Sequence, residues 1–228
     1  MSRIDFRKVP PSVVAIIHTR AGFQEAIQLT PQSADFLEFR ADLLLDNLTE
    51  LEDQLTQTRL PIILTLRSRK EGGRAPEDVV QRAALYARLV DKVHAMDTEL
   101  ATVRDWKLKA SPWHDSGCPL VLSYHDFTAT PTVPSLREKA SEAADLGASL
   151  FKIAALTESS RDVATLLEFL EIEDSLPLAV MGMGRYGMVS RLLFAQAGSR
   201  LNYGYLDRPI VPGQWPAAEL KSLISRLP

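Results

Sequence analysis

The chain has 228 residues, of which 46% are hydrophobic, and carries a formal net charge of -3 with a pI near 5.9. This size allows one substantial core in a single domain, and the small negative charge, without a long Lys/Arg run, argues against nucleic acid as a partner. No segment approaches the roughly 20 apolar residues of a membrane span, the N-terminus lacks a signal-peptide core, and the lone Cys118 cannot form an internal disulfide, so we expect a cytoplasmic protein.

Eight short segments have the apolar and β-branched composition of buried strands. In chain order they are 13–17, 35–40, 61–67, 93–100, 119–125, 149–154, 176–183 and 200–206. The segments between them include three with apolar residues at three- and four-residue spacing, which predicts amphipathic helices over 77–92, 136–147 and 160–174. In the second of these, Ser135 and Glu138 have the spacing of a capping box, and Gly147 is a candidate C-cap.

The separation between successive strands matches the length of one β-loop-α-loop unit. Eight such units predict that residues 1–228 form a single (β/α)8 TIM barrel as one catalytic domain. The alternative is an open doubly wound sheet. Its usual Gly-rich first turn is absent after 13–17, where the chain reads His-Thr-Arg-Ala-Gly.

Ionisable residues are concentrated at the carboxyl ends of the predicted strands, where barrels of this type place their active sites. They are Glu38, Arg40, Asp42, Arg67, Glu71, Asp97, Glu99, His125, Asp126, Lys152 and, just after the seventh strand, Arg191. So many charged groups at one mouth exceed what a packed barrel needs for stability. The sequence therefore predicts an active site there.

Lys152 lies in the middle of the apolar strand Ser-Leu-Phe-Lys-Ile-Ala, where desolvating a cation is costly. Burial and cationic neighbours such as Arg40, Arg67 or Arg191 disfavour the ammonium and make Lys152 a candidate Schiff-base nucleophile. The alternative is a structural lysine in a salt bridge with Glu38 or Glu99, or one whose head reaches out of the strand end.

His125 ends the preceding predicted strand, next to Lys152 in a parallel barrel. Because histidine titrates near neutrality, it is a candidate general acid/base, and Glu71 could orient its imidazole. The alternatives are a histidine that only supports its own loop, and a glutamate that is an ordinary turn residue before Gly72 and Gly73.

The arginines suggest an anionic, hydroxylated substrate, because a guanidinium binds a carboxylate through two parallel hydrogen bonds. Gly182, Gly184 and Gly187 match a phosphate-binding glycine pattern, but this match is weak because it comes late in the chain and has no acidic ribose partner. The sequence has no metal-ligand spacing, nucleophile elbow or P-loop, and we expect neither a metal nor an organic cofactor.

Six motifs in register resemble those of the type I 3-dehydroquinate dehydratases, over nearly the whole chain. They are EFRAD at 38–42, LTLRSRKEGG at 64–73, SYHDF at 123–127, FKIA at 151–154, MGMGRYGMVSR at 181–191 and PGQ at 212–214. The resemblance implies a cofactor-free hydro-lyase of the shikimate pathway, which converts 3-dehydroquinate to 3-dehydroshikimate through an imine. It also implies a homodimer of (β/α)8 barrels.

The resemblance further implies a role for each matched residue. Lys152 resembles the imine-forming lysine, His125 the general acid/base and Glu71 its partner. Glu38, Arg40 and Arg67 resemble the residues that hold the ring hydroxyls and order the lysine, and Arg191 resembles the clamp on the substrate carboxylate. Met183 is expected in the pocket wall, and Gln214 resembles a lid residue.

The chain departs from this family in two places. Relatives commonly have Ser-Ala before Pro-Gly-Gln in the lid, whereas this chain has Ile210 and Val211, so one hydrogen bond to the substrate is in doubt. About a dozen residues precede the first predicted strand, so the N-terminal hairpin that often plugs the barrel floor should be short or absent. We expect at most a brief strand or an ordered arm there.

Two other functions compete with the dehydratase. A class I aldolase also uses a strand lysine in a barrel, but it has no need for both His125 and the 212–214 lid. A non-catalytic sensor of quinate or dehydroquinate would be expected to have lost Lys152 or His125, and both are present.

Overall fold

The computed structural model describes residues 3–105 and 116–227, and its central feature is a barrel of parallel strands. The eight strands are β1 (Ser12–Ile17), β2 (Phe36–Arg40), β3 (Ile62–Thr65), β4 (Ala95–Glu99), β5 (Leu120–Asp126), β6 (Leu150–Leu156), β7 (Leu178–Met183) and β8 (Leu201–Tyr205). Neighbours from β1 to β7 pair in sequence order, and β8 pairs with β1. The predicted (β/α)8 barrel is therefore confirmed. The doubly wound open sheet is wrong, because β1 to β7 follow one another in sequence order without the reversal of strand order that such a sheet requires.

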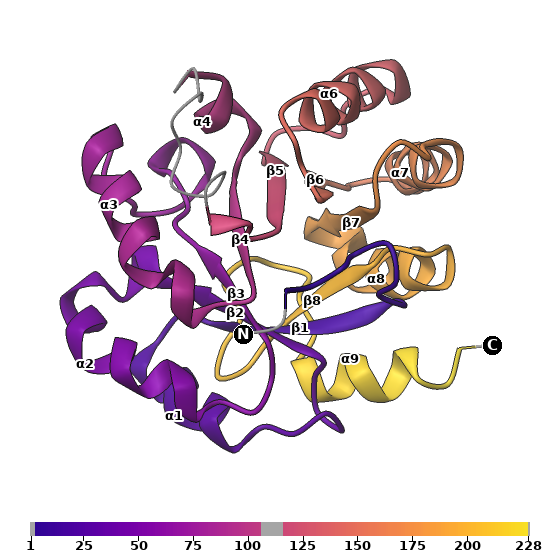
Figure 1. The fold of residues 1–228 in the computed structure, drawn as a ribbon. Helices are drawn as coiled ribbons and strands as arrows, with labels where there is room; N and C mark the ends of the chain where they lie inside the picture. The colour runs from indigo at the N-terminus through magenta and orange to yellow at the C-terminus, as the bar shows by residue number, and fades with distance from the viewer. Residues whose placement is uncertain (1–2, 106–115, 228) are drawn as a thin grey trace.

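The barrel is nearly closed between β7 and β8, where the Arg200 amide donates to the Leu178 carbonyl at 2.8 Å. Helices form a ring outside the strands (Figure 1). The α-helices are α1 (Arg20–Gln28), α2 (Leu48–Gln54), α3 (Val79–Leu89), α4 (Leu100–Asp105), α6 (Val133–Asp145), α7 (Ser160–Ile172), α8 (Gly187–Gln196) and α9 (Ala217–Ile224). Short 3-10 turns are η1 (Ala41–Leu43), η2 (Leu45–Asn47), η3 (Leu55–Gln57), η4 (Arg69–Glu71), η5 (Val90–Lys92) and η6 (Gly184–Tyr186).

Strand alternation divides the apolar side chains between two cores, because successive residues point to opposite faces of a sheet. In β6, Phe151 and Ile153 belong to the outer core between strands and helices, whereas Leu150 and Ala154 belong to the cluster inside the barrel. Lys152 lies two positions from both Leu150 and Ala154, so its side chain points to the same inner face of the barrel. The strand that made this lysine conspicuous in the sequence therefore directs it into the barrel.

Helix capping differs from the prediction at one helix. The N-cap of α6 is Thr132, without a side-chain capping bond, so the predicted Ser135–Glu138 capping box is wrong. Pro134 lies in the first turn, where proline is favourable, and this places the helix start upstream of Ser135. A reciprocal capping box is present at α7, between Ser159 and Asp162.

The described N-terminal residues 3–11 form no strand, which confirms that the chain has no full hairpin there. Instead they form an arm against the amino ends of the strands. Phe6 is 1% exposed and packs in the inner barrel cluster, and Arg3 donates to the Val93 carbonyl at 3.0 Å. Arg200 in turn holds the arm at the Val9 carbonyl, at 2.9 Å. In Figure 1 this indigo arm lies across the barrel between the N label and α8.

Replacing Phe6 by alanine should remove the apolar floor of the barrel. We expect Phe6→Ala to lower the free energy of unfolding by about 3–5 kcal/mol, as for other fully buried aromatic side chains. Urea unfolding followed by circular dichroism measures this change. Val80→Ala is the control, because Val80 is 75% exposed and its truncation should change stability by less than about 0.5 kcal/mol. Equal effects of the two substitutions would contradict the role assigned to Phe6.

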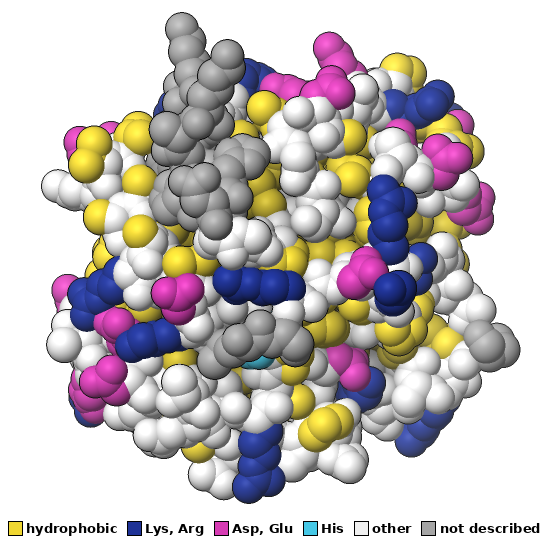
Figure 2. All heavy atoms as spheres, in the orientation of Figure 1, with side chains coloured by type: hydrophobic (Ala, Val, Ile, Leu, Met, Phe, Trp, Pro, Cys, Tyr) yellow, Lys and Arg dark blue, Asp and Glu magenta, His cyan; other side chains and the backbone are white. Residues whose placement is uncertain are grey.

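None of the described helices is long and apolar enough to cross a membrane. On the face shown in Figure 2, basic and acidic side chains are interspersed, without an extended area of one sign. The charge pattern of this face agrees with the small net charge of the sequence.

Candidate active site

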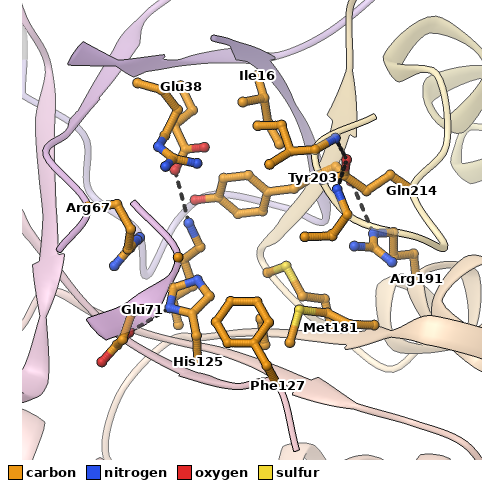
Figure 3. A pocket seen from close by; sticks show the side chains of 17 residues that line it. Ile16, Glu38, Arg67, Glu71, His125, Phe127, Met181, Arg191, Tyr203 and Gln214 are labelled. Atoms are coloured by element: carbon orange, nitrogen blue, oxygen red, sulfur yellow. Dashed lines mark hydrogen bonds and ion pairs between the residues drawn. The ribbon is translucent and has the colours of Figure 1, made fainter. Parts of the chain in front are cut away.

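A pocket opens at the carboxyl ends of the strands and encloses a cavity of about 150 Å³. All nine residues predicted for the site line it, namely Glu38, Arg40, Arg67, Glu71, His125, Lys152, Met183, Arg191 and Gln214. Figure 3 shows side chains converging on it from opposite sides of the barrel, with Glu38 and Arg67 on one side and Arg191 and Gln214 on the other. The barrel thus brings together residues that are up to 176 positions apart in the sequence, from Glu38 to Gln214.

The Lys152 amine is enclosed by polar and aromatic groups in the middle of the barrel. The side chain is 4% exposed, and Nζ lies 3.0 Å from Glu38 Oε1 and 2.9 Å from Asp97 Oδ2. Nζ also lies 3.9 Å from the centroid of the Tyr203 ring. Two carboxylates and an aromatic face all stabilise an ammonium. The sequence suggested arginines as the main neighbours of Lys152, whereas the groups in contact with its amine are two carboxylates. The alternative prediction, an ion pair with Glu38, is present in the structure.

Arg67 and Asp97 form the base of this site. The Arg67 guanidinium donates to Asp97 Oδ1 at 2.8 Å and to Glu99 Oε1 at 3.3 Å, and it also contacts Ser123 Oγ. Despite burial, which alone would raise it, the pKa of Asp97 is lowered because Arg67 and Lys152 lie beside the carboxylate. Asp97 therefore stays ionised between two cations.

Arg40 is fixed by a carboxylate close to it in sequence. Its Nε and Nη2 donate to the two Asp42 oxygens, each at 2.9 Å. Both side chains are nearly buried, and η1 places Asp42 directly after the strand end. The pairing holds the guanidinium at the pocket wall, where it can contact a ligand.

His125 and Glu71 form a pair on the opposite side of the lysine. His125 Nδ1 lies 2.7 Å from Glu71 Oε2, and both side chains are largely buried. The His125 ring stacks on Phe127 at a centroid separation of 6.2 Å. Because Nδ1 bonds to Glu71, Nε2 is the ring nitrogen left to act on a ligand in the pocket (Figure 3).

Burial shifts the pKa values of both members of this pair. Desolvation raises the pKa of Glu71 to about 8, although Arg67 opposes the shift. Burial, together with the charges of Arg67, Lys152 and Arg40, lowers the pKa of His125 well below its usual value. The pair therefore prefers a net neutral state near pH 7, with the shared hydrogen between Nδ1 and Oε2. Loss of one further proton leaves Glu71 ionised and His125 Nε2 with a free lone pair.

Arg191 is a buried cation held by backbone carbonyls. It lies in α8, is 1% exposed, and donates through Nη1 to Gly182, Gly187 and Gly213 and through Nε to Tyr203. Burial lowers the pKa of its guanidinium to about 10, which still leaves it charged at neutral pH. Among the described residues no carboxylate forms an ion pair with it. An anionic ligand in the pocket would offset the cost of this buried charge.

The loop over the pocket is held in place by Gln214 and by close backbone packing. Gln214 Oε1 accepts from the Ile210 amide at 2.7 Å and from the Val211 amide at 3.3 Å. Gly213 has a φ of +80°, and a Cβ atom there would lie 2.5 Å from the Gly184 carbonyl oxygen. Only glycine allows this approach, so the loop is anchored beside η6 with Ile210 and Val211 lining the pocket.

Several residues of the site have no role assigned from the sequence, and three of them carry the most weight in its geometry. Asp97 stood among the ionisable strand ends without an assigned role, and it contacts Lys152. Tyr203 and Phe127 carry no charge at neutral pH, so the concentration of charged residues at the strand ends does not point to them, yet both line the pocket. Tyr203 follows Leu201 by two positions in β8, and both side chains point into the barrel. This alternation is the sequence signal that could have identified Tyr203.

Comparisons with known proteins agree with this geometry. The family model for type I 3-dehydroquinase matches residues 13–227. The chain is 33% identical over 206 residues to the 3-dehydroquinate dehydratase of Methanocella arvoryzae, which covers 90% of this chain and 91% of that protein. It is 32% identical over 219 residues to the corresponding protein of Salmonella agona, with 89% of this chain and 86% of that one covered.

Solved structures give the same result. The 3-dehydroquinate dehydratase of Geobacillus kaustophilus superposes with a TM-score of 0.81 and 26% identity, covering 94% of this chain and 90% of that chain. The enzyme of Aquifex aeolicus superposes with a TM-score of 0.73 and 30% identity, covering 92% of this chain and 96% of that one. The chain therefore belongs to the type I 3-dehydroquinase family, a family of hydro-lyase enzymes.

Proposed function

We propose that this protein dehydrates 3-dehydroquinate to 3-dehydroshikimate through an imine on Lys152, as a cofactor-free step of the shikimate pathway in the cytoplasm. The observation that carries the proposal is that an enclosed lysine amine, a histidine–carboxylate pair and a buried arginine surround one pocket. The arginine has no acidic partner among the described residues. Residues 1–228 act in this proposal as one catalytic domain.

The first step joins the lysine to the substrate ketone. The ammonium of Lys152 must lose a proton before its nitrogen attacks the C3 carbonyl. The Glu38 carboxylate, 3.0 Å from the amine, is the group proposed to receive this proton and to return it when the hydroxyl of the adduct leaves as water. Addition gives a carbinolamine, and loss of water gives the iminium. The resulting cation withdraws electrons from C2, which makes the C2 proton removable.

The second step is the elimination itself. His125 Nε2 removes the C2 proton, and the electron pair enters the iminium to form an enamine. The enamine then expels the C1 hydroxyl, which leaves as water with the proton that His125 returns. Hydrolysis of the remaining imine by a second water releases the enone product and restores Lys152.

The other pocket residues hold the substrate in this orientation. We assign the substrate carboxylate to Arg191, because its charge is buried without an acidic partner among the described residues. In this proposal Glu38, Arg40 and Arg67 bind ring hydroxyls and Met183 forms part of the wall, which agrees with their positions in the lining of the pocket. Gln214 supports the loop that covers the ring, through its bonds to Ile210 and Val211.

The experiment that tests this function is intact-protein mass spectrometry after mixing with 3-dehydroquinate and sodium borohydride. The absorbance of the enone product is followed in parallel without borohydride. One covalent adduct on Lys152 together with product formation supports both the reaction and its route. An adduct without product would indicate a sensor, and the absence of both would return the aldolase as the better hypothesis.

The pKa of Glu71 gives this activity an expected pH dependence. Below about pH 8 the Glu71–His125 pair holds an extra proton, so Nε2 has no lone pair for the C2 proton. We therefore expect kcat/KM to rise with pH through about 8. In Glu71→Gln the group that titrates is absent, and the rise near this pH should disappear. The same rise in both proteins would show that another group controls it.

We also propose that the protein forms a homodimer through the exposed apolar side of α8. Met188, Val189 and Leu193 are 40%, 54% and 39% exposed on this helix, and a second copy would cover them. Light scattering after size-exclusion chromatography gives the mass directly. A monomer at micromolar concentration would contradict the proposal.

A further inference from the structure

The Tyr203 hydroxyl is a buried polar group to which none of the described residues offers a hydrogen bond. The residue is 2% exposed, and its oxygen forms no hydrogen bond with the described residues. Buried tyrosine hydroxyls usually find a partner, as Tyr86 does at the Asp97 carbonyl, 2.7 Å away. An unpaired hydroxyl costs stability, so its presence inside the active site calls for a functional explanation.

Tyr203 lies directly against the reacting lysine. The Lys152 amine is 3.9 Å from the ring centroid, and Figure 3 shows the hydroxyl end of Tyr203 directed toward the Glu38 side of the pocket. Burial and the charges of Glu38 and Asp97 raise the pKa of Tyr203 well above its usual value. The hydroxyl therefore remains a hydrogen-bond donor over the whole working pH range.

The number of hydrogens on the lysine nitrogen changes during the proposed reaction. An ammonium carries three hydrogens, and in the free enzyme three groups surround the Lys152 nitrogen, namely Glu38, Asp97 and the face of Tyr203. The iminium nitrogen carries one hydrogen. Formation of the intermediate therefore removes donors from at least one of the two carboxylates.

The two carboxylates are not equally supplied with other donors. Asp97 Oδ1 also accepts from Arg67 at 2.8 Å and from Ser123 at 2.7 Å. Besides Lys152, Glu38 accepts only from Thr65 among the described residues, at 2.9 Å on the same oxygen. Of the two carboxylates, Glu38 thus keeps fewer protein donors when the amine becomes an imine, and its Oε2, to which no described residue donates, can accept a further hydrogen bond besides one from a substrate hydroxyl.

We propose that Tyr203 is a positioning residue for the imine, whose hydroxyl donates to Glu38 once Lys152 has become covalently bound. Its ring meanwhile keeps the iminium charge over its face. The hydroxyl is thus destabilising in the free enzyme and stabilising in the covalent intermediate, which is the differential stabilisation that accelerates a step. The inference rests on the proposed imine mechanism.

The test is Tyr203→Phe, which keeps the ring and removes only the hydroxyl. We expect kcat to fall roughly tenfold or more, because a hydrogen bond to a charged group is lost in the intermediate, while KM changes little. The free enzyme should become more stable, with Tm higher by roughly 2–4 °C, because an unpaired buried polar group is removed. If the hydroxyl had only a structural role, its removal would not lower kcat and raise Tm in the same variant.

Tyr86→Phe is the matched control, because it removes a buried hydroxyl that has a partner. It should lower Tm and leave kcat close to that of the unmodified enzyme. Wild-type kcat in Tyr203→Phe, a lower Tm in that variant, or a loss carried by KM alone would each overturn the inference. Failure of the unmodified protein to form product would instead contradict the proposed function, so the two failures are distinguishable.

Discussion

Lys152→Ala is expected to abolish turnover and the borohydride-trapped adduct together. The substitution removes the proposed nucleophile, and loss of such a group lowers kcat by roughly 10⁵-fold or more. Steady-state absorbance of the enone and intact-protein mass measure the two effects. Wild-type turnover in Lys152→Ala would exclude the imine mechanism.

The same substitution should also lower stability, because Lys152 neutralises two buried carboxylates. Removing one partner of a buried ion pair costs about 3–5 kcal/mol, so Tm should fall by roughly 10 °C while circular dichroism still shows the folded barrel. Lys152→Met combined with Glu38→Gln removes the lysine and one of its carboxylates. The double variant should regain part of the lost stability and none of the activity, which separates the chemical role of the lysine from its structural one.

His125→Ala is expected to separate imine formation from elimination. Loss of a general acid/base lowers the rate by roughly 10²–10⁴-fold, so product formation should fall by this factor. Lys152 keeps its contacts in the variant, and borohydride should still trap one adduct on it. Rapid-quench mass spectrometry compares the rates of the two events.

His94→Asn is the matched control for this substitution. His94 Nδ1 accepts from the Ile62 amide at 3.0 Å, away from the pocket, and asparagine can offer an acceptor there. Turnover in this control should stay close to that of the unmodified enzyme. If His125→Ala lost the adduct as fully as the product, the histidine would also be needed for imine formation, and the proposed division of roles would be wrong.

The pH profile and the Lys152 variant address different groups of the site. The profile follows the pair formed by Glu71 and His125, which loses one of its two protons near pH 8. Lys152 is held by Glu38 and Asp97 on the other side. A variant that changes the pH profile but not the formation of the Lys152 adduct, or the reverse, therefore shows which of the two sets of residues is responsible for each property.

The strands, and through them the barrel, follow from patterns that can be read in the amino-acid sequence alone. Period-two alternation and buried runs identify strands locally, and their regular spacing leaves few topologies for eight of them. The same alternation put Lys152 and His125 on inward positions at adjacent strand ends. Because parallel strands in a barrel share one carboxyl end, these residues had to meet.

Local signals were less informative at helix ends. Ser135 and Glu138 have the spacing of a capping box, but Pro134 in the first turn moves the start of α6 to Val133. The capping box at Ser159 and Asp162 depends on side-chain rotamers and on the exact start of α7. Several capping patterns compete within a few residues, and packing against the barrel selects among them.

The pairing of the charged side chains, in contrast, depends on how the folded chain brings them together. The sequence offered several acids and arginines as neighbours of Lys152, and the register of β2, β4 and β6 selected Glu38 and Asp97. The tertiary structure also leaves Arg191 among backbone carbonyls, and the Tyr203 hydroxyl without a hydrogen-bond partner among the described residues. These facts depend on distances of a few ångströms between residues far apart in the chain. Sequence periodicity fixes the direction of a side chain, but it contains no information on such distances.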